Sequence, residues 1–252
     1  VFGGQVMGQA LSAAKHTVDE NRQVHSFHSY FLRPGDPRQP ILYLVEPTRD
    51  GRSFSARRIQ AVQHGRTILF MAASFQAPED GMDHQATMPQ VPGPEELEPY
   101  SKLMGRFLDR IPEAMRPKIA FDRPIEMRPV QVVDPLAPEA AEPMRHIWLR
   151  AEAGLPDDLG IHRYLLAYAS DFSLLATALL PHGRSFWQGN LKMATIDHAM
   201  WFHRELRFDD WILYAMDSPS ASGARGLVRG QLFDRSGNLV ASTIQEGLIR
   251  EV

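Results

Sequence analysis

The 252-residue sequence contains no cysteine. This absence excludes disulfide bonds, thiolate nucleophiles and metal sites built from cysteine, so any catalytic group must be of another kind. It also suits a reducing compartment, and we therefore predict a cytoplasmic protein.

A strong net charge is also missing. The 27 basic and 30 acidic side chains leave a formal net charge of −3, which predicts no general attraction to nucleic acid or to an anionic membrane. We identify no apolar run as long as a membrane span and no signal peptide. The chain begins at Val1 rather than at methionine, and residues 1–4 are typical of the entry to a helix. We therefore expect that residues preceding Val1 are missing.

Several catalytic and binding motifs are absent as well. The sequence has no G-x-S-x-G elbow, no H-E-x-x-H motif among its ten histidines and no Walker loop. Gly3, Gly4 and Gly8 do not have the spacing of a dinucleotide-binding loop. We therefore predict neither a metal site nor a cofactor.

The pattern of apolar and turn-forming residues predicts a helix followed by strands in the first part of the chain. The helix is expected over 3–18, where glycines would let it pack closely against a sheet. Turn-like breaks separate the strands expected over 23–32, 40–48, 53–64 and 67–77. Prolines then gather in residues 78–99, which we interpret as the start of an exposed linker.

Regular elements return after this linker, which we extend to residue 120 and which includes a short helix over 101–108. Two strands are expected over 125–133 and 144–153, and an apolar helix is expected over 163–180. The last strands are expected over 192–204, 211–218, 225–234 and 238–250.

The two halves of the chain repeat the same order of elements and some short strings. Residues 31–33, 41–43 and 58–60 match residues 202–204, 212–214 and 229–231 at one constant offset, and 71–76 match 240–245 after a small slip. Such self-similarity indicates duplication of one unit, a long helix across an antiparallel sheet. We predict an α+β protein with units over 1–77 and 121–252, a linker over 78–120, and the two sheets joined edge to edge.

The apolar helix predicted over 163–180 contains a single acid, Asp171. Its neighbours at helical spacing are Tyr164, Tyr168, Leu174 and Leu175, besides two alanines. A carboxylate on such a face loses water, so it needs hydrogen-bonding partners or its pKa rises. Asp171 is therefore either a buried structural acid or a catalytic one.

Two further polar residues lie in strands of the same unit. Thr195 is on the same side of its predicted strand as Asp197 and His203, with His198 on the other side. Gln245 lies in an otherwise apolar strand, where its amide needs up to four hydrogen-bonding partners. Together with Asp171 the two residues could hold a water molecule, although each also has a structural explanation.

Long strings distributed over essentially the whole chain resemble the acyl-CoA thioesterase II family, whose members contain two hotdog folds in one chain. The strings are VFGGQVMGQAL at 1–11, VHSFHSYFLRPGD at 24–36, GRSFSARR at 51–58, ASFQAPE at 73–79, ATIDHAMWFHR at 194–204, GARG at 223–226 and ASTIQEG at 241–247. The one difference that we note is Gly223, where the family often has serine. In the family a strand region precedes the first string, which agrees with the expected truncation.

The resemblance implies a double hotdog fold, a role in fatty acid metabolism and hydrolysis of acyl-CoA to a free fatty acid and CoA. It implies that Asp171, Thr195 and Gln245 are catalytic, with Asp171 orienting or deprotonating a water molecule that the other two help to hold. An oxyanion donor is expected among backbone N–H groups near a helix start. No cofactor is implied, since CoA enters within the acyl-CoA substrate, and a homodimer or homotetramer is expected.

Two alternative functions remain at this point. An enoyl-CoA hydratase or dehydratase with a hotdog fold would need a histidine such as His198 or His203 beside the acid. A non-catalytic acyl-CoA binding protein would have no use for three buried polar groups. The repeat favours a catalytic role, because Gln5 falls where we align Asp171, so the first unit lacks an acid there. We therefore expect one working site per chain. An apolar tunnel for the acyl chain is expected along the helices and the sheet, with Trp201 and Phe202 more readily explained as core.

Overall fold

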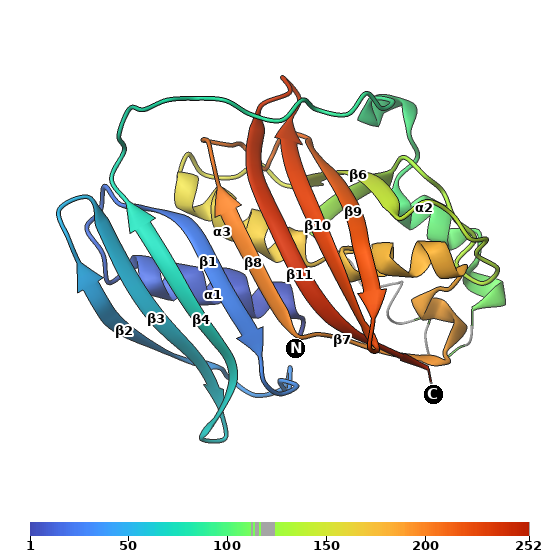
Figure 1. The fold of residues 1–252 in the computed structure, drawn as a ribbon, viewed down its shortest axis with the longest axis horizontal. Coiled ribbons are helices and arrows are strands. Elements are labelled where there is room, and N and C mark those ends of the chain that lie inside the picture. The colour runs from blue at the N-terminus through green and yellow to red at the C-terminus, as the bar shows by residue number, and fades with distance from the viewer. Residues whose placement is uncertain (112, 114–115, 117–123, 252) are drawn as a thin grey trace.

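The computed structural model describes residues 1–111, 113, 116 and 124–251. In this part of the chain, eleven strands form one antiparallel sheet, with strand order β2-β3-β4-β1-β8-β11-β10-β9-β6-β5 and β7 paired with β11 (Figure 1). The helices lie on one side of the sheet (Figure 1). This arrangement confirms the α+β class and the single continuous sheet.

The first unit consists of one helix and four strands. These are α1 (Gly3–Lys15), β1 (Gln23–Phe31), β2 (Leu42–Asp50), β3 (Phe54–Gln63) and β4 (Arg66–Gln76). Buried and exposed residues alternate along β3 because one face of the strand packs against the helix layer. The core of this layer includes Met7, Leu11, Phe27, Ile59 and Met71, each 0% exposed.

The second unit has the larger share of the sheet. Its strands are β5 (Ile125–Pro129), β6 (Met144–Ala151), β7 (Leu191–Thr195), β8 (Asp197–Phe202), β9 (Ile212–Ser222), β10 (Arg225–Asp234) and β11 (Leu239–Glu251). Its helices are α3 (Leu159–Ser170) and short 3₁₀ helices at Leu175–His182 and Phe186–Gln188. The segment between the two units contains α2 (Tyr100–Gly105) and 3₁₀ helices at Pro94–Glu96 and Leu108–Arg110. β10 corresponds to β3, because the bounds of the two strands differ by the constant offset seen in the sequence repeat.

The two units join through a pair of central strands. β1 and β8 run antiparallel, with Ser26 opposite Trp201, His28 opposite Ala199 and Tyr30 opposite Asp197. On either side of this pair the strands follow in matching order, β4-β3-β2 and β11-β10-β9. The joined sheet therefore places the helices of both units beside each other.

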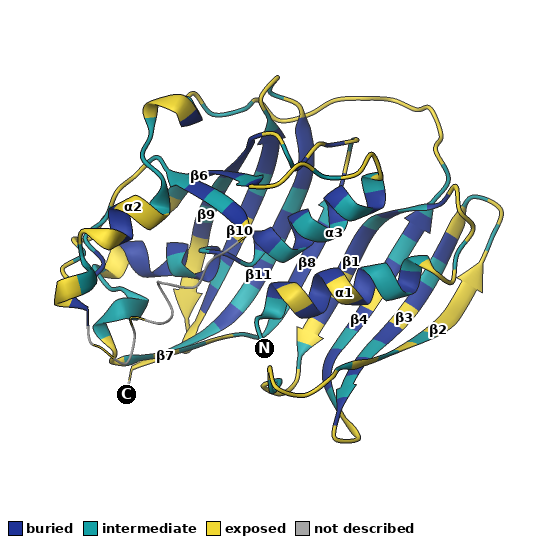
Figure 2. Ribbon diagram, turned by 180° about the vertical axis from the view of Figure 1, so that it is seen from behind, coloured by how far each residue is buried: buried dark blue, intermediate teal, exposed yellow. Residues whose placement is uncertain are grey.

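Helices α1 and α3 lie side by side on the same face of the sheet, and α1 presents exposed residues on its outer side (Figure 2). A Cβ atom at Gly4 would lie 2.2 Å from the Tyr168 carbonyl oxygen, and one at Gly8 would lie 2.9 Å from the Tyr164 carbonyl oxygen. The expectation that these glycines face the sheet is therefore wrong. They allow the two helices to approach each other.

The single helix expected over 163–180 is also wrong. α3 begins after Asp158, whose side chain accepts a hydrogen bond from the Gly160 N–H, and ends at Ser170. The chain then turns, with Ser173 at a φ of +63°, before the 3₁₀ helix Leu175–His182. Ser170, Asp171 and Ser173 are the short polar residues that disfavour helix interiors. Asp171 therefore follows the helix instead of lying within it.

By length and composition alone, the helical stretch Leu159–His182 could cross a membrane. The expectation that no segment meets this criterion is therefore wrong. However, 61% of its apolar window is buried inside the protein, and α3 packs against α1 and β1. The stretch is thus part of the core of this fold.

The proline-rich segment crosses from the first unit to the second along one rim of the sheet (Figure 1). Its Gln85 side chain donates to the Gly237 carbonyl at 2.8 Å and accepts from the Leu239 N–H at 3.0 Å. The short helix expected here is α2 at Tyr100–Gly105. The proposed end of the linker falls at 117–123, outside the described residues, and the domain boundaries stay predictions.

Candidate active site

The three residues singled out in the sequence meet at one place. Gln245 Nε2 lies 3.0 Å from Asp171 Oδ1 and 2.6 Å from Thr195 Oγ1, and Thr195 Oγ1 donates to Asp171 Oδ1 at 3.4 Å. Asp171 and Thr195 are partly buried, whereas Gln245 is 1% exposed. Three polar groups from three separate elements therefore form one hydrogen-bonded cluster.

A backbone group of the first unit completes this cluster. The Gly4 N–H, in the first turn of α1, donates to Asp171 Oδ2 at 3.0 Å. The start of a helix carries partial positive charge, which stabilises a carboxylate, whereas the end of α3 would repel one. A Cβ atom at Gly3 would lie 2.8 Å from the same carboxylate oxygen. The two glycines thus admit Asp171 to the N-terminus of α1.

The environment shifts the pKa of Asp171 in two directions. Burial raises the pKa above the ordinary value, and the hydrogen bonds from Gln245, Gly4 and Thr195 partly oppose this rise. The carboxylate is therefore a stronger base than a solvated aspartate, while three donors hold it in place. The Gln245 Oε1 atom is buried and has no hydrogen-bonding partner among the described residues, so it remains able to accept one.

The strand that contains Thr195 is interrupted, contrary to the prediction of one strand over 192–204. β7 ends at Thr195 and β8 begins at Asp197, and Ile196 between them donates to the Glu246 carbonyl. Because of this interruption, Thr195 and His198 both face the end of α3. Thr195 Oγ1 donates to Asp171, and His198 Nε2 lies 3.0 Å from Ser170 Oγ. The alternation argument that put His198 on the opposite side is therefore wrong.

The alignment of Gln5 with Asp171 is also wrong. Gln5 lies in the first turn of α1, whereas Asp171 caps the C-terminal end of α3. The corresponding cap of α1 is His16, which is exposed. The first unit thus has no acid at the matching helix end either, and the expectation of one site per chain rests on this corrected comparison.

Residues that the sequence did not single out fix the backbone next to Asp171. The Tyr214 hydroxyl donates to the Ser170 carbonyl at 2.9 Å and pairs with Thr243 Oγ1 at 2.9 Å. Tyr214 is 0% exposed. A hydroxyl in the apolar strand β9 is the same kind of signal that drew attention to Gln245, but its partner is a backbone carbonyl that sequence does not identify.

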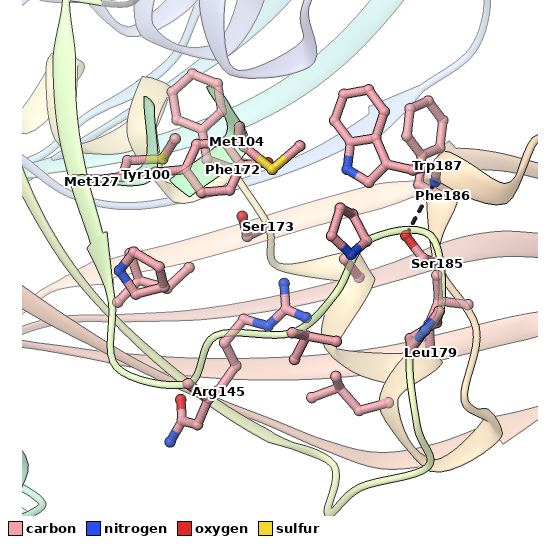
Figure 3. A pocket seen from close by; sticks show the side chains of 18 of the residues that line it. Tyr100, Met104, Met127, Arg145, Phe172, Ser173, Leu179, Ser185, Phe186 and Trp187 are labelled. Carbon is pink, nitrogen blue, oxygen red and sulfur yellow. Dashed lines mark hydrogen bonds between the residues drawn. The ribbon is translucent and has the colours of Figure 1, made fainter. Parts of the chain in front are cut away.

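Two cavities meet at Asp171. The larger has a volume of about 470 Å³ and the smaller about 340 Å³. Apolar residues of α2, β5 and the 3₁₀ helices line most of the larger cavity, and the labelled members surround it in Figure 3. The smaller cavity includes Thr195 and extends to Arg33. Neither cavity is lined by Trp201 or Phe202. Phe202 belongs to the buried core, as expected, whereas Trp201 is only partly buried and lies outside the core clusters.

The histidines do not supply an acid or base at this site. Burial lowers the pKa of His198 to about 3, so its ring is neutral, and it stacks on Phe27. His203 pairs with Ser242 in an exposed position. No histidine lines either cavity in the described part of the chain. Among the described residues, no group of three or more His, Asp or Glu side chains is placed to hold a metal.

Comparisons with known proteins agree over nearly the entire chain. The family model described as acyl-CoA thioesterase matches residues 115–248, and the acyl-CoA thioesterase N-terminal domain model matches residues 1–76. Acyl-CoA thioesterase 2 of Haemophilus influenzae is 45% identical over 250 residues, which cover 99% of this chain and 87% of that protein.

Solved structures give the same result. An acyl-CoA thioesterase II from Mycobacterium marinum has a TM-score of 0.82 and 43% identity, with coverage of 100% of this chain and 90% of that one. A hotdog-fold protein of unknown function from Alicyclobacillus acidocaldarius has a TM-score of 0.79 at 19% identity, covers 100% of this chain and 88% of that one, and supports the fold alone. The predicted hotdog fold is therefore confirmed.

Proposed function

The chain belongs to the acyl-CoA thioesterase family and hydrolyses acyl-CoA to a free fatty acid and CoA, and from this premise we propose that Asp171, Thr195 and Gln245 activate the attacking water. The observation that supports this role is the hydrogen-bonded cluster itself, which lies where two cavities meet.

In the proposed mechanism, Asp171 takes a proton from water as the water oxygen bonds to the thioester carbonyl carbon. Thr195 and Gln245 orient the same water, and the raised pKa of Asp171 makes proton transfer easier. Collapse of the tetrahedral intermediate breaks the carbon–sulfur bond, and the proton passes from Asp171 to the departing CoA sulfur. General-base assistance of this kind contributes about 10²–10⁴-fold.

The cavities suggest how the substrate lies. We place the acyl chain in the larger cavity because its lining is mostly apolar, and we place the developing oxyanion near the start of α1, where the helix dipole is positive. A thioester carbonyl is already reactive because sulfur donates little resonance to it. We therefore propose that no cofactor is needed and that CoA enters only as part of the substrate.

A double-mutant cycle tests whether the residues serve one water. Thr195→Ala and Gln245→Ala should each lower kcat by about ten- to a hundredfold, and the double variant should lose less than the product of the two effects. The measurement is release of free thiol from a saturated acyl-CoA.

The sequence repeat offers a matched control. Gln76 ends β4 at the position that the repeat aligns with Gln245, and the first unit has no corresponding acid. Gln76→Ala should therefore leave kcat unchanged. Fully multiplicative losses in the Thr195 and Gln245 variants, or an equal loss in the Gln76 variant, would contradict a single shared site.

We also propose that the protein forms a homodimer or homotetramer. Support comes from large apolar side chains that are exposed on the first unit, among them Tyr30 at 52%, Leu42 at 59% and Leu44 at 48%. Light scattering coupled to size-exclusion chromatography measures the mass directly. A monomer at all concentrations would contradict the proposal.

A further inference from the structure

A fully buried histidine lies close to the proposed catalytic acid. His198, on β8, is 0% exposed, and its Nε2 atom lies 3.0 Å from the Ser170 Oγ atom. Ser170 is the last residue of α3 and directly precedes Asp171 in the chain. His198 itself lines neither of the two cavities at Asp171. A role for His198 in the reaction must therefore act through Ser170.

The hydrogen bonds around Ser170 determine which nitrogen of the His198 ring carries the proton. The Ser170 hydroxyl donates to the Ala167 carbonyl at 2.9 Å, so its oxygen is left to accept. The His198 Nε2 atom therefore carries a hydrogen and donates it to Ser170 Oγ. The unprotonated Nδ1 atom is buried and has no hydrogen-bonding partner among the described residues. Because a buried acceptor without a partner is destabilising, stability alone does not explain this histidine.

The first unit shows that the fold does not require a histidine at this place. At the constant offset of the sequence repeat, the counterpart of His198 is Phe27 on β1, and the two rings stack with centroids 6.0 Å apart. In the pairing of β1 with β8, Ser29 lies opposite His198. Its counterpart Met200 lies opposite Phe27, so the two positions are equivalent in register. The unit that contains the polar cluster thus has a histidine donor where the other unit has an apolar ring.

Ser170 is held from two sides at the point where the chain leaves the helix. His198 contacts its hydroxyl, and the Tyr214 hydroxyl donates to its carbonyl at 2.9 Å, so β8 and β9 both fix it. The following residues turn along the wall of the larger cavity, with Ser173 at a φ of +63° (Figure 3). Because the cavity lies on that side, protein packing does not fix Asp171 there. The position of Asp171 depends on Ser170 and on the hydrogen bonds to its carboxylate.

Building on the proposed function, we propose that His198 is a positioning residue for Asp171 and acts by donating a hydrogen bond to Ser170. This bond fixes the end of α3 and therefore the direction in which the Asp171 side chain leaves the backbone. The carboxylate then meets Gly4 N–H at 3.0 Å and Gln245 Nε2 at 3.0 Å. Both contacts join separate elements, so a small shift of Ser170 would lengthen them together. A misplacement of about 1 Å can lower a rate by about a hundredfold.

Substitution by the residue of the first unit tests this role. His198→Phe removes the donor and should lower kcat for a saturated acyl-CoA by about ten- to a hundredfold, with little change in KM because His198 lines neither cavity. Ser170→Ala removes the acceptor of the same bond and should lower kcat by a similar factor. His198→Gln keeps an N–H donor at a similar reach and should retain most of kcat. Thermal unfolding shows which variants are folded, and wild-type kcat in folded His198→Phe or Ser170→Ala would overturn the proposal.

The acidic limb of kcat/KM against pH separates positioning from folding. Weaker hydrogen bonds to Asp171 raise its pKa, so the limb should move to higher pH in His198→Phe and stay in place in His198→Gln. Asp171 is the group that titrates, because burial keeps His198 neutral and Tyr214 protonated. Its pKa is otherwise shifted by uncharged donors, namely Gln245, Gly4 and Thr195, and not by the arginines of the two cavities, Arg33, Arg145 and Arg184. A lower kcat with an unmoved limb would reduce His198 to a folding role and overturn the proposal.

A matched variant and a second background complete the test. His203→Phe removes another histidine–serine pair, 2.9 Å long and outside the site, and should leave kcat unchanged. In an Asp171→Asn background, His198→Phe should cause no further loss, because its effect passes through the carboxylate. An equal loss in both backgrounds, or in His203→Phe, would overturn the proposal. Wild-type activity of Asp171→Asn alone would instead contradict the proposed function, so the two failures are distinguishable.

Discussion

At the scale of single residues, the ionisation of Asp171 controls the proposed reaction. Burial raises its pKa and the donor Gln245 lowers it, with burial the larger effect. Because the base must be ionised, activity should decline as the pH falls through this raised pKa, at a higher pH than the ordinary aspartate value of about 4 would give. The measurement is kcat/KM of wild type against pH.

The hydrogen bond from Gln245 provides a second test of this pH profile. Removing the donor in Gln245→Ala should raise the pKa of Asp171 further. The acidic limb of the profile should therefore move to higher pH, and the maximum of kcat/KM should fall. An acidic limb that moves to lower pH, or one centred at the ordinary aspartate value in wild type, would show that Asp171 is not the titrating base.

The sequence was informative at this scale where a polar residue stood in apolar surroundings. Asp171 and Gln245 stood out in this way, and the family resemblance joined Thr195 to them. Gly4 and Ser170 act through backbone groups, and a backbone N–H or carbonyl has no sequence signature of its own. Their partners are remote in the sequence: Gly4 and Asp171 are 167 residues apart, and Ser170 and Tyr214 are 44 residues apart.

At the scale of elements, the close packing of α1 on α3 positions the carboxylate. A Cβ atom at Gly4 would lie 2.2 Å from the Tyr168 carbonyl oxygen, a backbone atom that cannot move aside. Gly4→Ala should therefore separate the helices, lower the free energy of unfolding by about 1–3 kcal/mol and reduce kcat, because the Gly4 N–H would withdraw from Asp171. Thermal unfolding and the thiol-release assay measure the two effects.

A surface glycine provides the control for this variant. A Cβ atom at Gly81 would meet nothing within 4 Å, so Gly81→Ala should change neither stability nor activity. If Gly4→Ala retained both at the wild-type level, the contact between the two helices would not be what places Asp171.

The observed strand boundaries agree with the predicted ones where glycine-containing turns separate the strands. The glycine turns between β2, β3 and β4 fall as predicted. The break between Thr195 and Asp197 was missed because Ile196 is a β-favouring residue with no turn character, and the interruption arises from pairing with both β11 and β1. The end of α3 at Ser170 was missed because the apolar pattern continues past it into the 3₁₀ helix.

At the scale of the whole molecule, the joined sheet explains how one site uses both units. Asp171, Thr195 and Gln245 belong to the second unit, whereas the donor Gly4 belongs to the first. The repeat predicted the joined sheet because matching strings imply matching strands. It did not predict that each helix would face the other, because helix–helix packing depends on the three-dimensional joining of β1 and β8.

The central claim is that Asp171 activates the water for the only working site of the chain. The most direct test compares the rate of CoA release from a saturated acyl-CoA by wild type and by Asp171→Asn, with thermal unfolding measured to establish that the variant is folded. We predict a folded variant whose rate is lower by about 10²–10⁴-fold. A folded Asp171→Asn variant that releases CoA at the wild-type rate, or at about half of it as a second site would allow, would contradict the claim.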